Sequence, residues 1–179
     1  MNILKDVHPI DYLLAAVMVA LAVLLAVFNM TATEDAGLTQ PLDSQSALMI
    51  PVFALAALPI LWRRHHVLAA LGVSVAVVAL SVPAFGWVTR CGFALPLSIA
   101  FAYAVARFAG PGRGQVLGLI GVLALQVVTL VRDASTGGFD ALPLSVPLAA
   151  IAYGAGLLVR RGVAARASTP TLSTEHVNA

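Results

Sequence analysis

Six apolar stretches, each about as long as a lipid bilayer is thick, occupy most of this 179-residue chain. They lie at residues 12–30, 47–62, 67–88, 93–108, 115–131 and 141–159. A helix that crosses a bilayer needs about 20 predominantly apolar residues, whereas a barrel strand alternates apolar and polar positions. These stretches are apolar on all sides. We therefore predict an all-α fold, a polytopic integral membrane protein with a six-helix transmembrane bundle.

The composition excludes an ordinary soluble domain. Of the residues, 60% are apolar and only 10% are charged, whereas about 25% are charged in soluble domains. A chain of this length cannot hide so much apolar surface in a core of its own. We therefore expect the lipid bilayer to surround it, and the net charge of +2 gives no reason to expect nucleic acid as a partner.

The basic residues divide unevenly between the loops. If both termini are cytoplasmic, the inner side holds eight of the ten: Lys5, Arg63, Arg64, Arg107, Arg113, Arg160, Arg161 and Arg166. The outer side then holds only Arg90 and Arg132. The positive-inside rule therefore predicts a multi-pass protein of the plasma membrane with both termini in the cytoplasm (N-in, C-in). Residues 1–11 and a basic, disordered tail at 160–179 would be its cytoplasmic ends.

The ends of the stretches carry residues typical of a membrane interface. An arginine at the bilayer centre costs about 2.5–3.5 kcal/mol on the insertion scale, so we expect Arg90 and Arg107 at interfaces. Trp62 and Trp87 close the second and third stretches, as aromatic belt residues do. Small residues four positions apart predict close helix packing in lipid: Ala16/Ala20, Ala22/Ala26, Ala150/Gly154 and Ala152/Gly156.

Few residues in the sequence are candidates for catalysis or ligand binding. Apart from Arg107, which we expect at the end of the fourth span, the predicted spans hold no charged side chain, although such residues usually mark membrane enzymes and transporters. Gln126, near the middle of the fifth span, is the most conspicuous polar residue. It either contacts a ligand in a cavity or forms a hydrogen bond between helices, and we favour the second interpretation.

Two further patterns resemble binding motifs without fulfilling them. His65 and His66 are adjacent, so on a helix they point about 100° apart and chelate a metal poorly; we interpret them as part of a basic cap. The segment 110–114 is rich in glycine but lacks the GK[ST] ending of a phosphate-binding loop. The single cysteine, Cys91, permits no intramolecular disulfide. We predict no catalytic, cofactor-binding or metal-binding residue, and no enzyme activity.

The order of several short motifs resembles a known family. An aspartate (Asp11) precedes the first span, the second span ends in Leu61-Trp62-Arg63-Arg64, and the third follows almost at once. The fourth span closes on Tyr103-Ala-Val-Ala-Arg107 before Arg113, and the last runs through glycines into Arg160-Arg161. Over residues 8–166 this arrangement is similar to the N-terminal membrane domain of two-component sensor histidine kinases of the actinobacterial type.

The resemblance implies a sensor or input domain that forms homodimers and works with a histidine kinase and a response regulator. The kinase domains themselves do not appear in this sequence, and His176 does not match the phosphorylated histidine. We therefore expect a non-catalytic module, either a stand-alone relative of the sensor domain, which we favour, or part of a longer kinase.

Two other classes remain open. Small transport subunits, such as the substrate-binding component of a vitamin importer, also have about six spans and an Ala-x-x-x-Ala motif on the first helix, here Ala16/Ala20. A purely structural subunit of a larger membrane complex is the third class.

Overall fold

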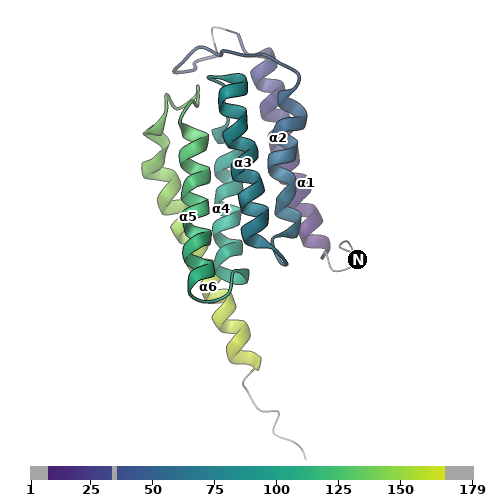
Figure 1. Cartoon of the computed structure of the whole chain (residues 1–179), viewed down its shortest axis with the longest axis vertical. Coiled ribbons are helices and arrows are strands. Elements are labelled where there is room, and N and C mark those ends of the chain that lie inside the picture. The colour runs from purple at the N-terminus through teal and green to yellow at the C-terminus, as the bar shows by residue number, and fades with distance from the viewer. Residues whose placement is uncertain (1–7, 34–35, 168–179) are drawn as a thin grey trace, which may run out of the picture.

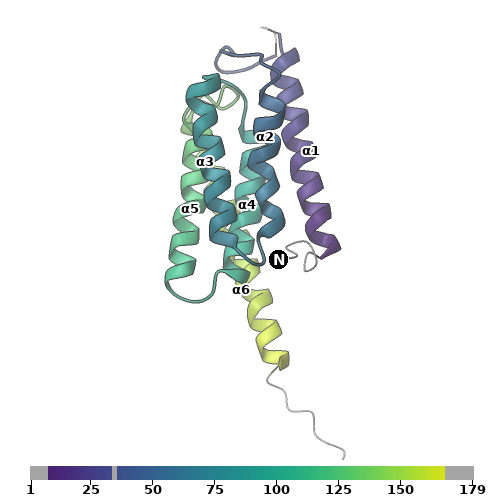
Figure 2. The same ribbon diagram turned by 45° about the vertical axis from the view of Figure 1, so that its right-hand side comes forward.

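The described part of the computed structural model, residues 8–33 and 36–167, forms one bundle of six α-helices (Figures 1 and 2). The elements are α1 (Pro9–Thr31), α2 (Met49–Ala57), the 3-10 helix η1 (Leu58–Trp62), α3 (Val67–Phe85), α4 (Cys91–Phe108), α5 (Arg113–Leu130), the 3-10 helix η2 (Phe139–Ala141) and α6 (Leu142–Ala167). Within these residues the only β feature is an isolated bridge between Val88 and Asp133. The all-α, six-helix prediction is confirmed.

Five of the six helical segments are long and apolar enough to cross a membrane. The exception is the predicted second span, which folds as α2 followed directly by η1. Pro59 lacks the N–H that an α-helix needs at that position, and the chain tightens into a 3-10 turn there. Since a 3-10 helix rises about 2.0 Å per residue, α2 and η1 together still reach about 24 Å, against about 30 Å for a hydrocarbon core.

Helix α4 is the centre of the bundle and contacts each of the other five helices. Its Phe93, Leu97 and Phe101 side chains are fully buried, and the Phe93 ring lies 4.8 Å from the ring of Phe53 on α2. In contrast, large apolar side chains such as Leu80 are exposed on the outer surface. Lipid tails solvate an exposed leucine as well as a protein core does, so close packing rather than escape from water must hold these helices together.

Small residues bring α6 against α4. A side chain at Gly156 would place its Cβ 2.7 Å from the backbone oxygen of Tyr103, so the two helices approach too closely there for any residue but glycine. Ala152, one turn earlier, also packs against the core. A Cβ at Gly154, by contrast, would meet nothing within 4 Å. Of the two predicted pairs on α6, only Ala152/Gly156 therefore packs against α4.

Helix α1 begins and α6 ends at the same end of the bundle (Figures 1 and 2). We call this the basic end, because it carries Arg63, Arg64, Arg107, Arg113, Arg160, Arg161 and Arg166. Here α6 projects past its neighbours, and its residues 161–166 are exposed. The sequence predicted a disordered tail from residue 160, but the helix continues to Ala167, since alanine and arginine are strong helix formers. Residues 168–179, including His176, lie outside the described residues.

Smaller differences at helix boundaries have local causes. Helix α1 begins at Pro9 rather than Tyr12, because the fixed φ of proline suits the first position of a helix. Helix α3 ends at Phe85 instead of Val88, where Gly86 turns the backbone with a φ of 65°. A side chain at Gly86 would also collide with the carboxylate of Asp43.

Candidate functional site

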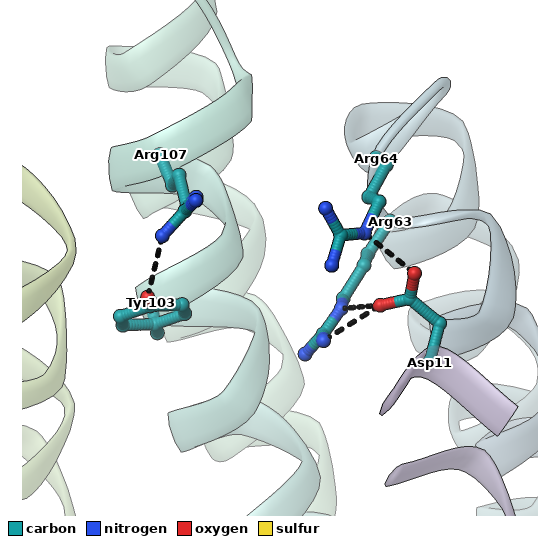
Figure 3. A network of polar contacts seen from close by, with 5 residues as sticks. All are labelled: Asp11, Arg63, Arg64, Tyr103 and Arg107. Atoms are coloured by element: carbon teal, nitrogen blue, oxygen red, sulfur yellow. Dashed lines mark hydrogen bonds and ion pairs between the residues drawn. The ribbon is translucent and has the colours of Figure 1, made fainter. Parts of the chain in front are cut away.

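At the basic end, one buried carboxylate holds two arginines. The Asp11 side chain, in the first turn of α1, is 0% exposed. Its Oδ1 accepts hydrogen bonds from Arg63 Nε at 3.0 Å and Arg63 Nη2 at 2.7 Å, and its Oδ2 accepts one from Arg64 Nε (Figure 3). The start of α1 is thereby tied to the turn between η1 and α3. A carboxylate in the first helical turn is also stabilised by the helix dipole.

A third arginine approaches the same region from α4. Arg107 Nη1 donates a hydrogen bond to the Tyr103 hydroxyl at 3.1 Å, one turn back on the same helix (Figure 3). The guanidinium carbons of Arg107 and Arg64 each lie 5.5 Å from the centre of the Phe108 ring, within the range of a cation–π contact. Three arginines and one carboxylate therefore meet between α1, the η1–α3 turn and α4. We call Asp11, Arg63, Arg64, Arg107 and Phe108 the arginine cluster.

The arginines that the sequence assigned to the membrane interface fall into two groups, those inside the arginine cluster and those outside it. Arg63, Arg64 and Arg107 belong to the arginine cluster, whereas Arg113 and Arg161 lie exposed at the same end, outside it. Arg160 is half-buried on the projecting part of α6.

The two tryptophans lie where their stretches end, at opposite ends of the bundle. Trp62 is 36% exposed at the basic end. Trp87 is half-buried in the α3–α4 connection, where its backbone N–H donates a hydrogen bond to Asp43 Oδ2 at 2.8 Å.

Sequence reasoning missed the role of Asp11, which it placed in a cytoplasmic segment. The prediction that no span holds a charged residue apart from Arg107 is wrong for α1, because Asp11 lies inside the helix and is buried. The available signal was a lone acid just before an apolar run, in a chain whose next inner loop begins with two arginines.

At the opposite end, Arg90 lies at the end of a span rather than inside one, as the sequence predicted, but its side chain is buried. It precedes α4 and is 0% exposed, so it does not face lipid headgroups. Its guanidinium donates five hydrogen bonds, to Ser81 Oγ and to the backbone oxygens of Ser81, Gly86, Val88 and Arg132. Burial lowers the pKa of Arg90 to about 10, although the nearby Asp133 carboxylate acts to raise it. Arg90 therefore stays cationic at neutral pH. Carbonyl dipoles from three segments replace the water around this charge.

Asp133 joins the same loops from the other side, and we call Arg90, Asp133 and their hydrogen-bond partners the Arg90–Asp133 lock. Its Oδ2 accepts the backbone N–H groups of Arg90 and Cys91, each at 2.7 Å, and so caps the start of α4. Its Oδ1 accepts bonds from Ser135 and Thr136. The amide of Asn29 pairs with the backbone of Thr89 through two 2.8 Å hydrogen bonds. Helix α1, the α3–α4 connection and the α5–α6 connection are therefore bonded together.

Gln126 is fully buried between three helices. Its Nε2 donates to Ser98 Oγ on α4 at 3.2 Å and to the backbone oxygen of Ser145 on α6 at 3.1 Å. Among the described residues, its Oε1 and the hydroxyl of Ser145 have no hydrogen-bond partner. Gln126 therefore forms hydrogen bonds between helices, and half of its amide is left unpaired.

Within residues 8–33 and 36–167, no three His, Cys, Asp or Glu side chains gather as metal ligands would. His65 and His66 are exposed on the turn before α3. No protein-family model matches this sequence, no curated protein is similar to it, and no solved structure matches it. The function is therefore inferred from the residues of the chain itself.

Proposed function

We propose that this chain is a non-catalytic membrane module of the sensor type, which passes a change in the bundle to a partner through α6. The observation that carries the proposal is α6 itself, one continuous helix that runs from the bundle core to beyond the basic end. Its exposed final residues carry Arg161 and Arg166. They offer a helical surface to a partner outside the bilayer.

Contacts within the bundle supply a route to that helix. Helix α4 begins in the Arg90–Asp133 lock at the opposite end and reaches Arg107 at the basic end. It also packs directly against α6 at Gly156. A stimulus that loosens the lock would therefore shift α4, and α6 would move with it because the two helix backbones are in contact. Packed interfaces of this kind switch between discrete arrangements rather than deform continuously.

The positive-inside rule places the basic end in the cytoplasm. The projecting part of α6 would then face the compartment that holds kinase domains and response regulators. The resemblance to sensor histidine kinases over residues 8–166 supports this assignment, and homodimerisation belongs to the same proposal.

The test is deletion of the chain, followed by measurement of response-regulator phosphorylation on Phos-tag gels under membrane stress. We expect altered phosphorylation of at least one regulator. Wild-type protein and the Gly154→Leu control should restore it, whereas Gly156→Leu, which forces α6 away from α4, should not restore it at equal membrane abundance. Unchanged phosphorylation of every regulator after deletion would contradict the proposal.

One observation favours a transport subunit as a second candidate. Ala16 and Ala20 lie exposed on α1, so the bundle itself does not use this pair. Two exposed small residues four apart allow a helix of another protein to approach closely. A tagged pull-down from native membranes in mild detergent separates the candidates. Recovery of a transporter ATPase, lost in an Ala16→Leu variant, would support transport; recovery of a histidine kinase would support the sensor module.

A further inference from the structure

The arginine cluster has more positive charge than the bundle neutralises. Arg63 and Arg64 share one carboxylate, that of Asp11, whose two oxygens are already hydrogen-bonded. Among the described residues Arg107 has no ion-pair partner. In the described residues Arg64 uses only its Nε in a hydrogen bond and Arg107 only its Nη1. Each guanidinium carries five N–H groups. Most N–H groups of these two arginines are therefore free to bind an anion.

A pocket at the bundle surface lies beside both arginines. Its lining includes His65 and Phe108, which follow them in the sequence, but neither arginine. Phe108, whose ring lies 5.5 Å from each guanidinium carbon, forms one wall. His65 and His66 from the η1–α3 turn line the other side, and the pocket volume is about 340 Å³. Ligand pockets begin at about 300 Å³, so this one has room for a small headgroup.

An apolar groove continues from that pocket. Trp62, Ala69 and Val73 line it, its volume is about 300 Å³, and it shares His66 and Ala69 with the first pocket. The groove follows the outer side of α3 away from the basic end, in the direction an acyl chain takes into a bilayer. A pocket beside two arginines is thus joined to an apolar groove at the end of two predicted spans.

We infer that this pair of cavities binds a phosphate-bearing anion, and that its source is an anionic phospholipid. The headgroup phosphate lies between Arg64, Arg107 and the two histidines, and the first part of an acyl chain lies along Trp62. Guanidinium groups are the side chains best suited to phosphate oxygens. Free phosphate shares the headgroup chemistry but would leave the groove empty. This inference is independent of the proposed sensor function.

Lipid titrations of the purified full-length chain, read by native mass spectrometry, provide the test. Phosphatidylglycerol and phosphatidylcholine with identical acyl chains are compared, and inorganic phosphate is added as a competitor. Each basic residue near an anionic surface contributes about 1 kcal/mol, which is about fivefold in affinity. We therefore expect Arg107→Gln to reduce the preference for phosphatidylglycerol about fivefold and Arg64→Gln/Arg107→Gln to abolish it. Arg113→Gln, an exposed arginine at the same end, should leave it unchanged.

A second readout locates the lipid. In a Trp87→Phe background Trp62 is the remaining tryptophan, and brominated phosphatidylglycerol should quench it more strongly than brominated phosphatidylcholine does. Equal binding of both lipids, or an equal loss with Arg113→Gln, would overturn the proposal. Displacement of the lipid by inorganic phosphate would overturn the lipid assignment and identify free phosphate as the ligand. Because Arg107 does not touch Asp11, its variant keeps the test valid even if Arg64→Gln disturbs folding.

Discussion

Asp11 and Arg63 are 52 positions apart in the sequence, yet Arg63 Nη2 lies 2.7 Å from Asp11 Oδ1 and the carboxylate is shielded from solvent. This contact joins the start of the first helix to the turn that ends the second. It also holds one carboxylate between two arginine side chains at the edge of the membrane region. The pair is therefore a structural clamp on which the arginine cluster is built.

Asp11→Asn should destabilise the protein by about 3 kcal/mol, the lower end for breaking a buried ion pair. The neutral amide leaves Arg63 and Arg64 uncompensated, and Arg64 is partly exposed, which limits the cost. Thermal unfolding in detergent can be followed with a thiol-reactive dye, because the one cysteine, Cys91, is partly buried. Asp140→Asn, the same change at an exposed carboxylate, should leave the melting temperature unchanged. Equal melting of both variants would show that the clamp contributes nothing.

Arg90→Lys should also destabilise, although the charge is kept. A lysine ammonium donates at most three hydrogen bonds, whereas the guanidinium makes five. Buried acceptors left without a donor cost about 1–3 kcal/mol each, so we expect the loss of two donors to cost about 2–6 kcal/mol. Arg132→Lys, at an exposed neighbouring arginine, is the control and should be neutral. A fully stable Arg90→Lys protein would mean that only the charge matters.

Gly156→Ala should weaken the packing of α6 on α4. The added Cβ would lie 2.7 Å from the Tyr103 oxygen and from the Ala106 Cβ, and overpacking of this kind costs about 1–3 kcal/mol. Gly154→Ala introduces the same methyl group into open space on the same helix and should be neutral or slightly stabilising. Melting temperatures of the two variants give the comparison, and a more stable Gly156→Ala protein would contradict the observed helix contact.

Gln126→Leu should change stability little, by about 0.6 kcal/mol, the average for a hydrogen bond between membrane helices. The two bonds lost to Ser98 and Ser145 are offset because the unpaired Oε1 disappears as well. Unfolding curves measure the stability, and the phosphorylation assay described above measures signalling. Unaltered stability combined with lost signalling would instead support the ligand interpretation of Gln126.

Cysteine labelling in intact cells tests the orientation. In a Cys91→Ser background, Ala47→Cys lies before α2 at the opposite end and Ala164→Cys lies on the projecting part of α6. If the basic end is cytoplasmic, a membrane-impermeant maleimide labels Ala47→Cys directly and labels Ala164→Cys only after permeabilisation. The reverse pattern would overturn the N-in, C-in assignment.

The helices were predictable from the sequence because their signal is local. A run of apolar residues as long as a bilayer is thick predicts a spanning helix wherever it packs, and the glycines at 110–114 mark a turn between two such runs. The effect of Gly86, which ends α3 at Phe85, was not predicted. Arg63, Arg64 and Arg107 were also recognisable as basic residues at helix ends. The number of helices and their approximate bounds follow from such short-range patterns.

Which of these residues meet was decided only by the tertiary structure. Asp11 pairs with Arg63, Asn29 with Thr89, and Asp133 with the start of α4, each across more than forty positions. In a hydropathy profile a single charged residue is assigned to a loop. The free energy of burying its charge depends on whether a partner group reaches it. How the helices pack decides which group that is. The sequence placed Arg90 at the end of a span, but only the folded protein shows that it is buried among five acceptors from α3, the α3–α4 connection and the turn after α5.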